Sequence, residues 1–249
     1  MTDIVLIHGA WQGGWVWHDI EPNLAAAGHR CHAVDLPGSA PDTPDRASVT
    51  FADQVAFLQN LIAGIDGKVI VVGHSGGGLA ASQIAEEMPD RVMGVVYVVG
   101  MMLPDGVRFA DVVESCREQA PSASGIWPHL DHIEGMSVVP ADAAIDIFYH
   151  DCEPSAAIAA ASKLTPQSNA ARDVAPRISE ARFGSVPRVY IEALNDRSLV
   201  PAVQRRMQEL VQGASVRQMD TGHAPMLADP DGLADLLLTS IAELDATVE

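Results

Sequence analysis

The sequence predicts an α/β fold in which about six mainly parallel strands form one doubly wound sheet. Short apolar runs alternate with helical patterns along most of the 249 residues, and this alternation is typical of strand–helix–strand units. A glycine-rich turn follows one apolar run at residues 73–78, and the alternation resumes after residues 101–184, which interrupt it. The chain length suits a single domain of this class with an insertion.

The N-terminal elements follow in a regular order. The four expected strands are apolar runs, and the helices between them end at Gly28, at Gly64 and before Pro89, residues that terminate helices. Residues 39–50 hold two prolines and several Ser, Thr and Asp residues, and they are predicted to form a loop. The predicted strands are 4–7, 31–34, 69–72 and 93–99, and the predicted helices are 17–27, 51–63 and 76–87.

Residues 101–184 are expected to form an inserted helical cap, although a separate small domain is the alternative. This segment has helical patterns at 141–149 and 154–164 and no run typical of a buried strand. The predicted core is therefore residues 1–100 and 185–249. Its second part has strands at 188–193 and 215–219, a helix at 201–210, and a closing helix over 227–244 with a break near Pro230.

Composition excludes several classes of function. The formal net charge of −18 disfavours binding to nucleic acid or anionic membranes, and it weakly favours neutral substrates. Three scattered cysteines predict neither a disulfide framework nor a zinc site. We find no signal peptide and no apolar run as long as the ~18 residues of a membrane span, so we expect a cytoplasmic protein.

A serine nucleophile is predicted at Ser75. The sequence Gly-His-Ser-Gly-Gly at 73–77 follows the apolar run 69–72 directly, and a strand that leads into Gly-x-Ser-x-Gly is typical of a nucleophile elbow. In this sharp turn the positions two before and two after the serine must be small, and Gly73 and Gly77 satisfy that requirement. The alternative is an ordinary glycine-rich turn.

His223 and Asp196 are the predicted partners of Ser75, because a serine hydroxyl needs a base and the base needs an orienting acid. Both residues follow late strands, and the ends of parallel strands meet at one edge of a sheet. The order Ser, Asp, His is that of α/β-hydrolases. The alternatives are a surface role for His223, a helix-capping role for Asp196, and Asp105 as a weaker candidate for the acid.

The backbone N–H groups of Gly76 and Ala10 are the expected oxyanion hole, since two donors must face the developing charge. Ala10 follows His8-Gly9 in the loop after the first strand, and we expect His8 to tie loops together through ring hydrogen bonds. Candidate pocket residues, for each of which core packing is an equal alternative, are Trp11, His74, Met101, Trp127, Met136, Phe148, Tyr149 and Leu199.

The chain resembles the methylesterase and hydroxynitrile lyase branch of the α/β-hydrolases, which includes plant salicylate-type methylesterases and bacterial carboxylesterases. The matching segments span nearly the whole chain and are 4–17, 35–38, 73–75, 148–152, 195–197 and 222–223. The resemblance implies an α/β-hydrolase fold, a six-stranded core, a small helical cap and no cofactor. Members are often dimers, so a homodimer is a possible state.

Two positions favour ester hydrolysis over cyanohydrin cleavage. The lyases of this branch carry threonine where this chain has Ala10, and lysine where it has Ala224; without a cation, departing cyanide is not stabilised. The family usually has a bulky residue at the position of Gly76, so we expect a wider acyl pocket here.

The expected function is a serine carboxylesterase that hydrolyses small to medium neutral esters through an acyl-enzyme. The alternatives are a carbon–carbon lyase, a lactonase, a ligand-binding receptor or a cofactor-free oxygenase.

Overall fold

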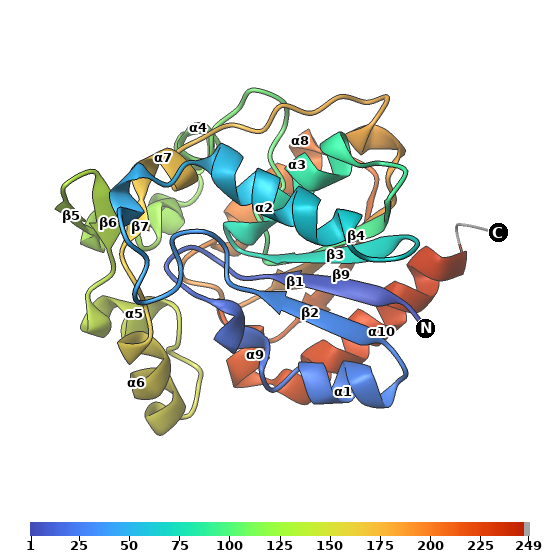
Figure 1. Ribbon diagram of the computed structural model, residues 1–249. Helices are drawn as coiled ribbons and strands as arrows, with labels where there is room; N and C mark the ends of the chain where they lie inside the picture. The colour runs from blue at the N-terminus through green and yellow to red at the C-terminus, as the bar shows by residue number, and fades with distance from the viewer. Residues whose placement is uncertain (247–249) are drawn as a thin grey trace.

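A six-stranded parallel sheet forms the centre of the protein in the computed structural model, which describes residues 1–246 (Figure 1). The strand order is β2-β1-β3-β4-β8-β9, and every neighbouring pair is parallel. The strands are β1 (Asp3–Ile7), β2 (Arg30–Val34), β3 (Val69–His74), β4 (Val92–Val98), β8 (Arg188–Ala193) and β9 (Ala214–Met219). The prediction of a doubly wound parallel sheet with six strands is confirmed.

Helices cover both faces of this sheet. Figure 1 shows α2 (Phe51–Ala63) and α3 (Gly77–Glu87) on one face, and α1 (Glu21–Ala26) and α10 (Pro230–Ala246) on the other. All residues of β1, β3 and β8 are consequently buried. This explains why 4–7 in β1 and 69–72 in β3 are continuous apolar runs rather than alternating ones. Within residues 1–246 no helix has the length and apolar character needed to cross a membrane.

The helices largely confirm the predicted bounds. α2 begins after Thr50, whose hydroxyl accepts the N–H of Asp53 while the Asp53 carboxylate accepts the N–H of Thr50, a reciprocal capping box. The prediction of one helix over 17–27 is wrong: a 3₁₀ turn, η1 (Gly14–Trp17), precedes α1. Pro22 lies in the first turn of α1, where a residue without N–H is tolerated, so α1 begins at Glu21.

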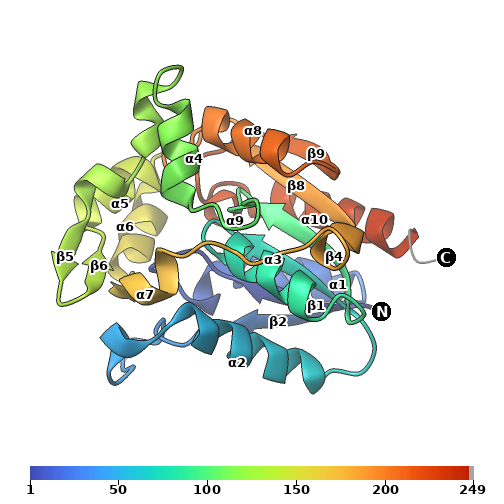
Figure 2. The same cartoon turned by 90° about the horizontal axis from the view of Figure 1, so that it is seen from above.

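The part of residues 101–184 from α4 (Phe109–Cys116) to α7 (Asn169–Arg172) gathers at the end of the sheet away from the chain termini, whereas the segment after α7 runs back along α3 (Figure 2). Beside helices, residues 101–184 contain an antiparallel three-stranded sheet, which the sequence did not predict because its strands have only two or three residues each. The division into a core and a cap at residues 101 and 184 stays a prediction. The elements are α4 (Phe109–Cys116), η3 (Pro121–Ser124), η4 (Trp127–His129), β5 (Asp131–Ile133), β6 (Met136–Val138), α5 (Ala141–Ile147), α6 (Pro154–Ser162), β7 (Gln167–Ser168) and α7 (Asn169–Arg172).

The sheet brings distant loops to one edge. Ser75 follows β3, Asp196 follows β8 and His223 follows β9, and because these strands are parallel their carboxyl ends open onto the same side. The remaining elements are η2 (Arg46–Ser48), η5 (Phe183–Ser185), α8 (Pro201–Leu210) and α9 (Pro225–Ala228). The predicted break in the closing helix lies between α9 and α10.

Candidate active site

The turn that carries Ser75 is strained and closely packed. Ser75 has a φ of 48°, in the left-handed region that non-glycine residues seldom adopt. Its carbonyl oxygen accepts the N–H groups of Gly78 and Met101 at 3.0 and 2.8 Å. A Cβ at Gly73 would lie 2.7 Å from the Gly77 carbonyl oxygen, and a Cβ at Gly77 would lie 2.5 Å from that of His8. The two glycines therefore allow the chain to turn within a space that no side chain fits.

Ser75, His223 and Asp196 form a continuous hydrogen-bonded chain. The Ser75 Oγ lies 3.1 Å from the His223 Nε2, and the His223 Nδ1 lies 2.8 Å from the Asp196 Oδ2. The three residues are 5, 2 and 3 % exposed, respectively. A carboxylate accepts hydrogen bonds only, so Asp196 selects the tautomer with a proton on Nδ1. The lone pair on Nε2 then faces the hydroxyl.

Asp196 is itself fixed by backbone donors. Its Oδ1 accepts the N–H groups of Ser198 and Leu199 at 2.6 and 3.0 Å, so the other oxygen is left to accept from His223. The alternative acid, Asp105, uses its Oδ1 to accept the N–H of Ile178 at the protein surface. Among the candidate acids weighed in the sequence, Asp196 is the one that the fold brings to the imidazole.

The segment 148–151 covers the imidazole of His223. The Phe148 ring stacks on it with a centroid separation of 5.0 Å and an interplanar angle of 29°. The Asp151 carboxylate accepts the N–H of Gly222, and a Cβ at Gly222 would lie 2.6 Å from that carboxylate. A ring and a carboxylate from the insertion thus hold both the side chain and the backbone of the histidine loop.

His74 does not line the pocket that the sequence predicted for it. It is fully buried behind His223, where its Nε2 lies 2.8 Å from the His223 carbonyl oxygen and its Nδ1 lies 3.0 Å from the Gln12 Oε1. Burial, aided by the neighbouring His223, lowers the pKa of His74 well below its ordinary value. The ring therefore supports the backbone of the histidine loop instead of facing the substrate side.

The amides of Ala10 and Gly76 lie beside each other. A Cβ on Gly76 would be 3.4 Å from the Ala10 nitrogen, and neither N–H has a protein acceptor within residues 1–246. His8 holds the adjacent loop, because its Nδ1 donates to the Gly9 carbonyl at 2.8 Å and its Nε2 accepts the N–H of Leu36 at 3.1 Å. The expected loop-tying role of His8 is confirmed, and burial lowers the pKa of its ring.

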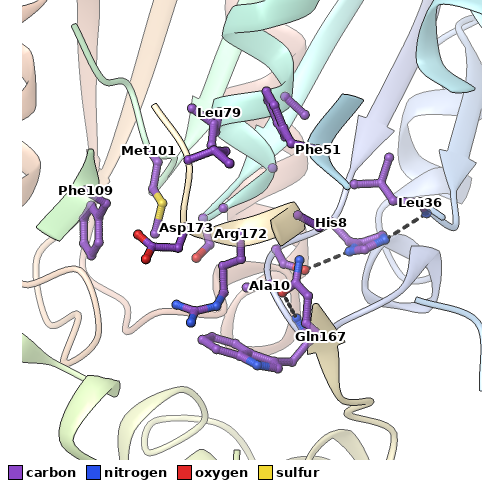
Figure 3. A pocket seen from close by; sticks show the side chains of 18 of the residues that line it. His8, Ala10, Leu36, Phe51, Leu79, Met101, Phe109, Gln167, Arg172 and Asp173 are labelled. Carbon is purple, nitrogen blue, oxygen red and sulfur yellow. Dashed lines mark hydrogen bonds between the residues drawn. The ribbon is translucent and has the colours of Figure 1, made fainter. Parts of the chain in front are cut away.

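A cavity opens over Ser75 and these two amides (Figure 3). Four of the predicted pocket residues line it, namely Trp11, Met101, Trp127 and Leu199. With His74, the other residues that do not line it are Met136, Phe148 and Tyr149. Met136 pairs with Ser168 in the small sheet, Phe148 stacks on His223, and the Tyr149 hydroxyl accepts from the Gln12 Nε2 at 3.4 Å. The side chains of these three residues, which the sequence showed only to be apolar and close to the site, are therefore used in contacts within the protein.

Sequence reasoning missed several lining residues, of which Arg172 is the most distinctive. It closes the four-residue helix α7, and its guanidinium carbon lies 4.2 Å from the ring centroid of Trp127 and 5.4 Å from that of Trp11. No motif surrounds it, and a single arginine in a polar segment is usually a surface residue. The other missed lining residues include Leu36, Phe51, Gln54, Leu79, Phe109, Ile126, Gln167 and Asp173.

Known proteins resemble this chain over nearly its full length. The chain is 30 % identical to a pyrethroid hydrolase of Sphingobium wenxiniae over 95 % of its length and 86 % of that protein. It is 29 % identical to Methylesterase 1 of Arabidopsis thaliana, with 94 % of each chain covered. The crystal structure of a pyrethroid hydrolase from Sphingobium faniae superposes with a TM-score of 0.82 at 28 % identity, covering 96 % of both chains.

These relatives confirm the resemblance to the methylesterase branch, and the similarity to a solved hydrolase confirms the fold class. Residues 4–236 match the model of the "Alpha/beta hydrolase family". The chain therefore belongs to the α/β-hydrolase family.

Proposed function

We propose that this protein is a serine carboxylesterase that uses Ser75 as nucleophile, His223 as general base and acid, and Asp196 as the group that orients the base. The observation that carries the proposal is the buried hydrogen-bonded chain from the Ser75 Oγ through the His223 ring to the Asp196 carboxylate. The relatives whose names describe esterases and a hydrolase support the same reaction class.

In the first half of the reaction, the Ser75 oxygen attacks the ester carbonyl carbon while the His223 Nε2 takes the hydroxyl proton. The carbonyl oxygen becomes an oxyanion, which the N–H groups of Ala10 and Gly76 stabilise because both line the cavity beside Ser75. The imidazolium then gives its proton to the departing alkoxide. An alcohol leaves, and the acyl group stays on the serine oxygen.

In the second half, His223 removes a proton from water, which attacks the acyl carbon. The tetrahedral intermediate collapses, the proton returns to the Ser75 oxygen, and the carboxylic acid leaves. Asp196 stays ionised throughout and stabilises the imidazolium that forms in each half.

Ester hydrolysis is favoured over cyanohydrin cleavage by the position after the histidine. Ala224 is completely buried, and Arg172 is the only lysine or arginine among the described residues that line the cavity. The residue next to His223 therefore supplies no cation that could stabilise departing cyanide. A cyanohydrin substrate should give no cyanide above the background of the Ser75→Ala variant.

The nucleophile assignment is tested by Ser75→Ala together with a serine-directed phosphonate. With a small nitrophenyl ester, the substitution should lower kcat by ~10³-fold or more, and mass spectrometry should place a single phosphonate on Ser75 in the unsubstituted protein. Comparable turnover by the variant, or an adduct on another residue, would reject covalent catalysis at Ser75.

The substrates we propose are small to medium esters. The homodimer and the cytoplasmic location expected from the sequence stay predictions.

A further inference from the structure

Arg172 is a partly buried cation in a protein with a net charge of −18. It lines the cavity that contains Ser75, Ala10 and Gly76, and no other lysine or arginine of residues 1–246 does so. Burial lowers the pKa of its guanidinium to about 10, so the group is still a cation at neutral pH. The cavity consequently holds one guanidinium cation, beside the Asp173 carboxylate that also lines it.

The guanidinium is held between two aromatic rings that are themselves fixed. Trp127, at 4.2 Å, stacks on Phe109 with a centroid separation of 6.0 Å. Trp11, at 5.4 Å, stacks on Phe148 and donates its indole N–H to the Ser137 Oγ at 3.0 Å. Cation–π contacts hold a guanidinium in place and leave the donors at its edge available. Trp11 also follows Ala10 directly, which ties this arrangement to the oxyanion loop.

The donors of Arg172 are only partly used. Its Nη2 donates to the Asn169 Oδ1 at 3.1 Å, whereas its Nε and Nη1 are buried without a hydrogen-bond partner among the described residues. Asp173 lines the same cavity and is solvent-exposed, yet it forms no ion pair with Arg172 within 4 Å (Figure 3). Buried charged donors without acceptors are costly, so a ligand that brings an acceptor oxygen would be stabilised here.

We propose that Arg172 binds a carboxylate on the substrate, so that the preferred substrates are esters with an ionised carboxyl group on the acyl or the alcohol part. A carboxylate is planar and matches the planar donors of a guanidinium. This inference rests on the proposed esterase function. The net charge of the protein favours neutral substrates, whereas Arg172 would favour substrates with a carboxylate in the cavity. Asp173, an anion that lines the same cavity, weakens this attraction.

Two pairs of esters of matched shape test the proposal. One pair carries the charge on the acyl side, 4-nitrophenyl hydrogen adipate against the neutral 4-nitrophenyl adipamate. The other carries it on the alcohol side, 4-(acetoxymethyl)benzoate against 4-(acetoxymethyl)benzamide. The readout is the ratio of kcat/KM for the charged ester to that for its neutral partner at neutral pH, because a general loss of activity cancels in this ratio.

In at least one pair the ratio should fall by about 10- to 100-fold in Arg172→Gln, the range for a lost charge-assisted hydrogen bond. Asp173→Asn should move the same ratio upward by about two- to tenfold, because it removes an opposing charge. Arg206→Gln is the matched control. It removes one positive charge from a half-exposed residue that pairs with Glu209 in α8 and does not line the cavity, so the ratio should not change.

The result that overturns the proposal is a ratio that is the same in the unsubstituted protein and in Arg172→Gln for both pairs, whatever Asp173→Asn does. Where Arg172→Gln does not fold, a ratio for the unsubstituted protein that stays at or below one in both pairs also overturns the proposal. If the ratio is unchanged while the unsubstituted protein hydrolyses the neutral esters and Ser75→Ala does not, this inference fails and the esterase proposal stands. If none of the four esters is hydrolysed, the esterase proposal fails first.

Discussion

Replacement of Asp196 by asparagine should disable the active site without disturbing its shape. The Asp196 Oδ1 accepts two backbone N–H groups, from Ser198 at 2.6 Å and from Leu199 at 3.0 Å. An amide must place its only oxygen at these two donors, because an NH₂ group there would face two N–H groups. The asparagine NH₂ then occupies the position of Oδ2, 2.8 Å from the His223 Nδ1.

The size of the effect follows from that orientation. The His223 Nδ1 has to accept from the amide, so the ring carries its proton on Nε2, which lies 3.1 Å from the Ser75 Oγ. A protonated Nε2 cannot remove the hydroxyl proton. In a Ser–His–Asp triad the wrong tautomer lowers kcat by about 10⁴-fold, which corresponds to about 5.5 kcal/mol in activation free energy.

The assay is steady-state hydrolysis of 4-nitrophenyl acetate, with kcat and KM determined separately and urea unfolding used to compare stability. Asn195→Ala is the matched control, since Asn195 is the exposed neighbour whose side chain binds Asp220; its kcat should stay within about threefold. A folded Asp196→Asn variant that keeps more than about a thirtieth of the original kcat would refute the tautomer argument.

Three further substitutions test other parts of the site. Gly76→Leu should reduce turnover of bulky acyl esters more than that of acetate esters. A Cβ at this position has only ordinary contacts with Ala10, so the rest of the leucine side chain would enter the cavity. Equal losses on both kinds of ester would count against a wider acyl pocket. Gly77→Ala should lower the free energy of unfolding in urea by about 1–3 kcal/mol or more, since its Cβ would lie 2.5 Å from the His8 carbonyl oxygen; an unchanged urea midpoint would contradict this. The free energy of unfolding should also fall as pH decreases below about 6.5, because the lowered pKa values of His8 and His74 mean that the unfolded chain binds protons that the folded chain excludes. His74→Gln should make this pH dependence shallower, and the same slope in both proteins would show that His74 is not one of the groups involved.

The core could be predicted because its signals are local. β1 and β3 are buried on both faces, so their sequences are unbroken apolar runs, and the bounds of α2 agree with the prediction because Thr50 and Asp53 cap it three residues apart. The sequence pattern of the elbow is also local, because the two positions that must lack a side chain, Gly73 and Gly77, lie within one turn. Together with the rule that parallel strands end at one edge, these signals were enough to bring Ser75, Asp196 and His223 forward as candidates.

The cavity wall could not be predicted in the same way, because it depends on contacts between distant segments. Arg172 belongs to a helix of four residues, and its partners Trp11 and Trp127 lie far from it in the sequence. Phe148 and Tyr149 were marked by their aromatic character, but a ring has the same sequence signal whether it faces a ligand or a neighbour. The direction of each side chain is set only when the insertion packs on the sheet.

The contact between the insertion and the histidine loop shows what this packing achieves. Asp151 and Gly222 are 71 residues apart, and the space around Gly222 is so restricted that a Cβ there would lie 2.6 Å from the Asp151 carboxylate. Phe148, three residues before Asp151, stacks on the His223 ring. The insertion that lines part of the cavity, through Trp127 and Arg172, thus also holds His223. The position of the His223 imidazole therefore depends on the packing of residues 148–151. If residues 101–184 packed differently, the distances within the proposed triad would change along with the shape of the pocket.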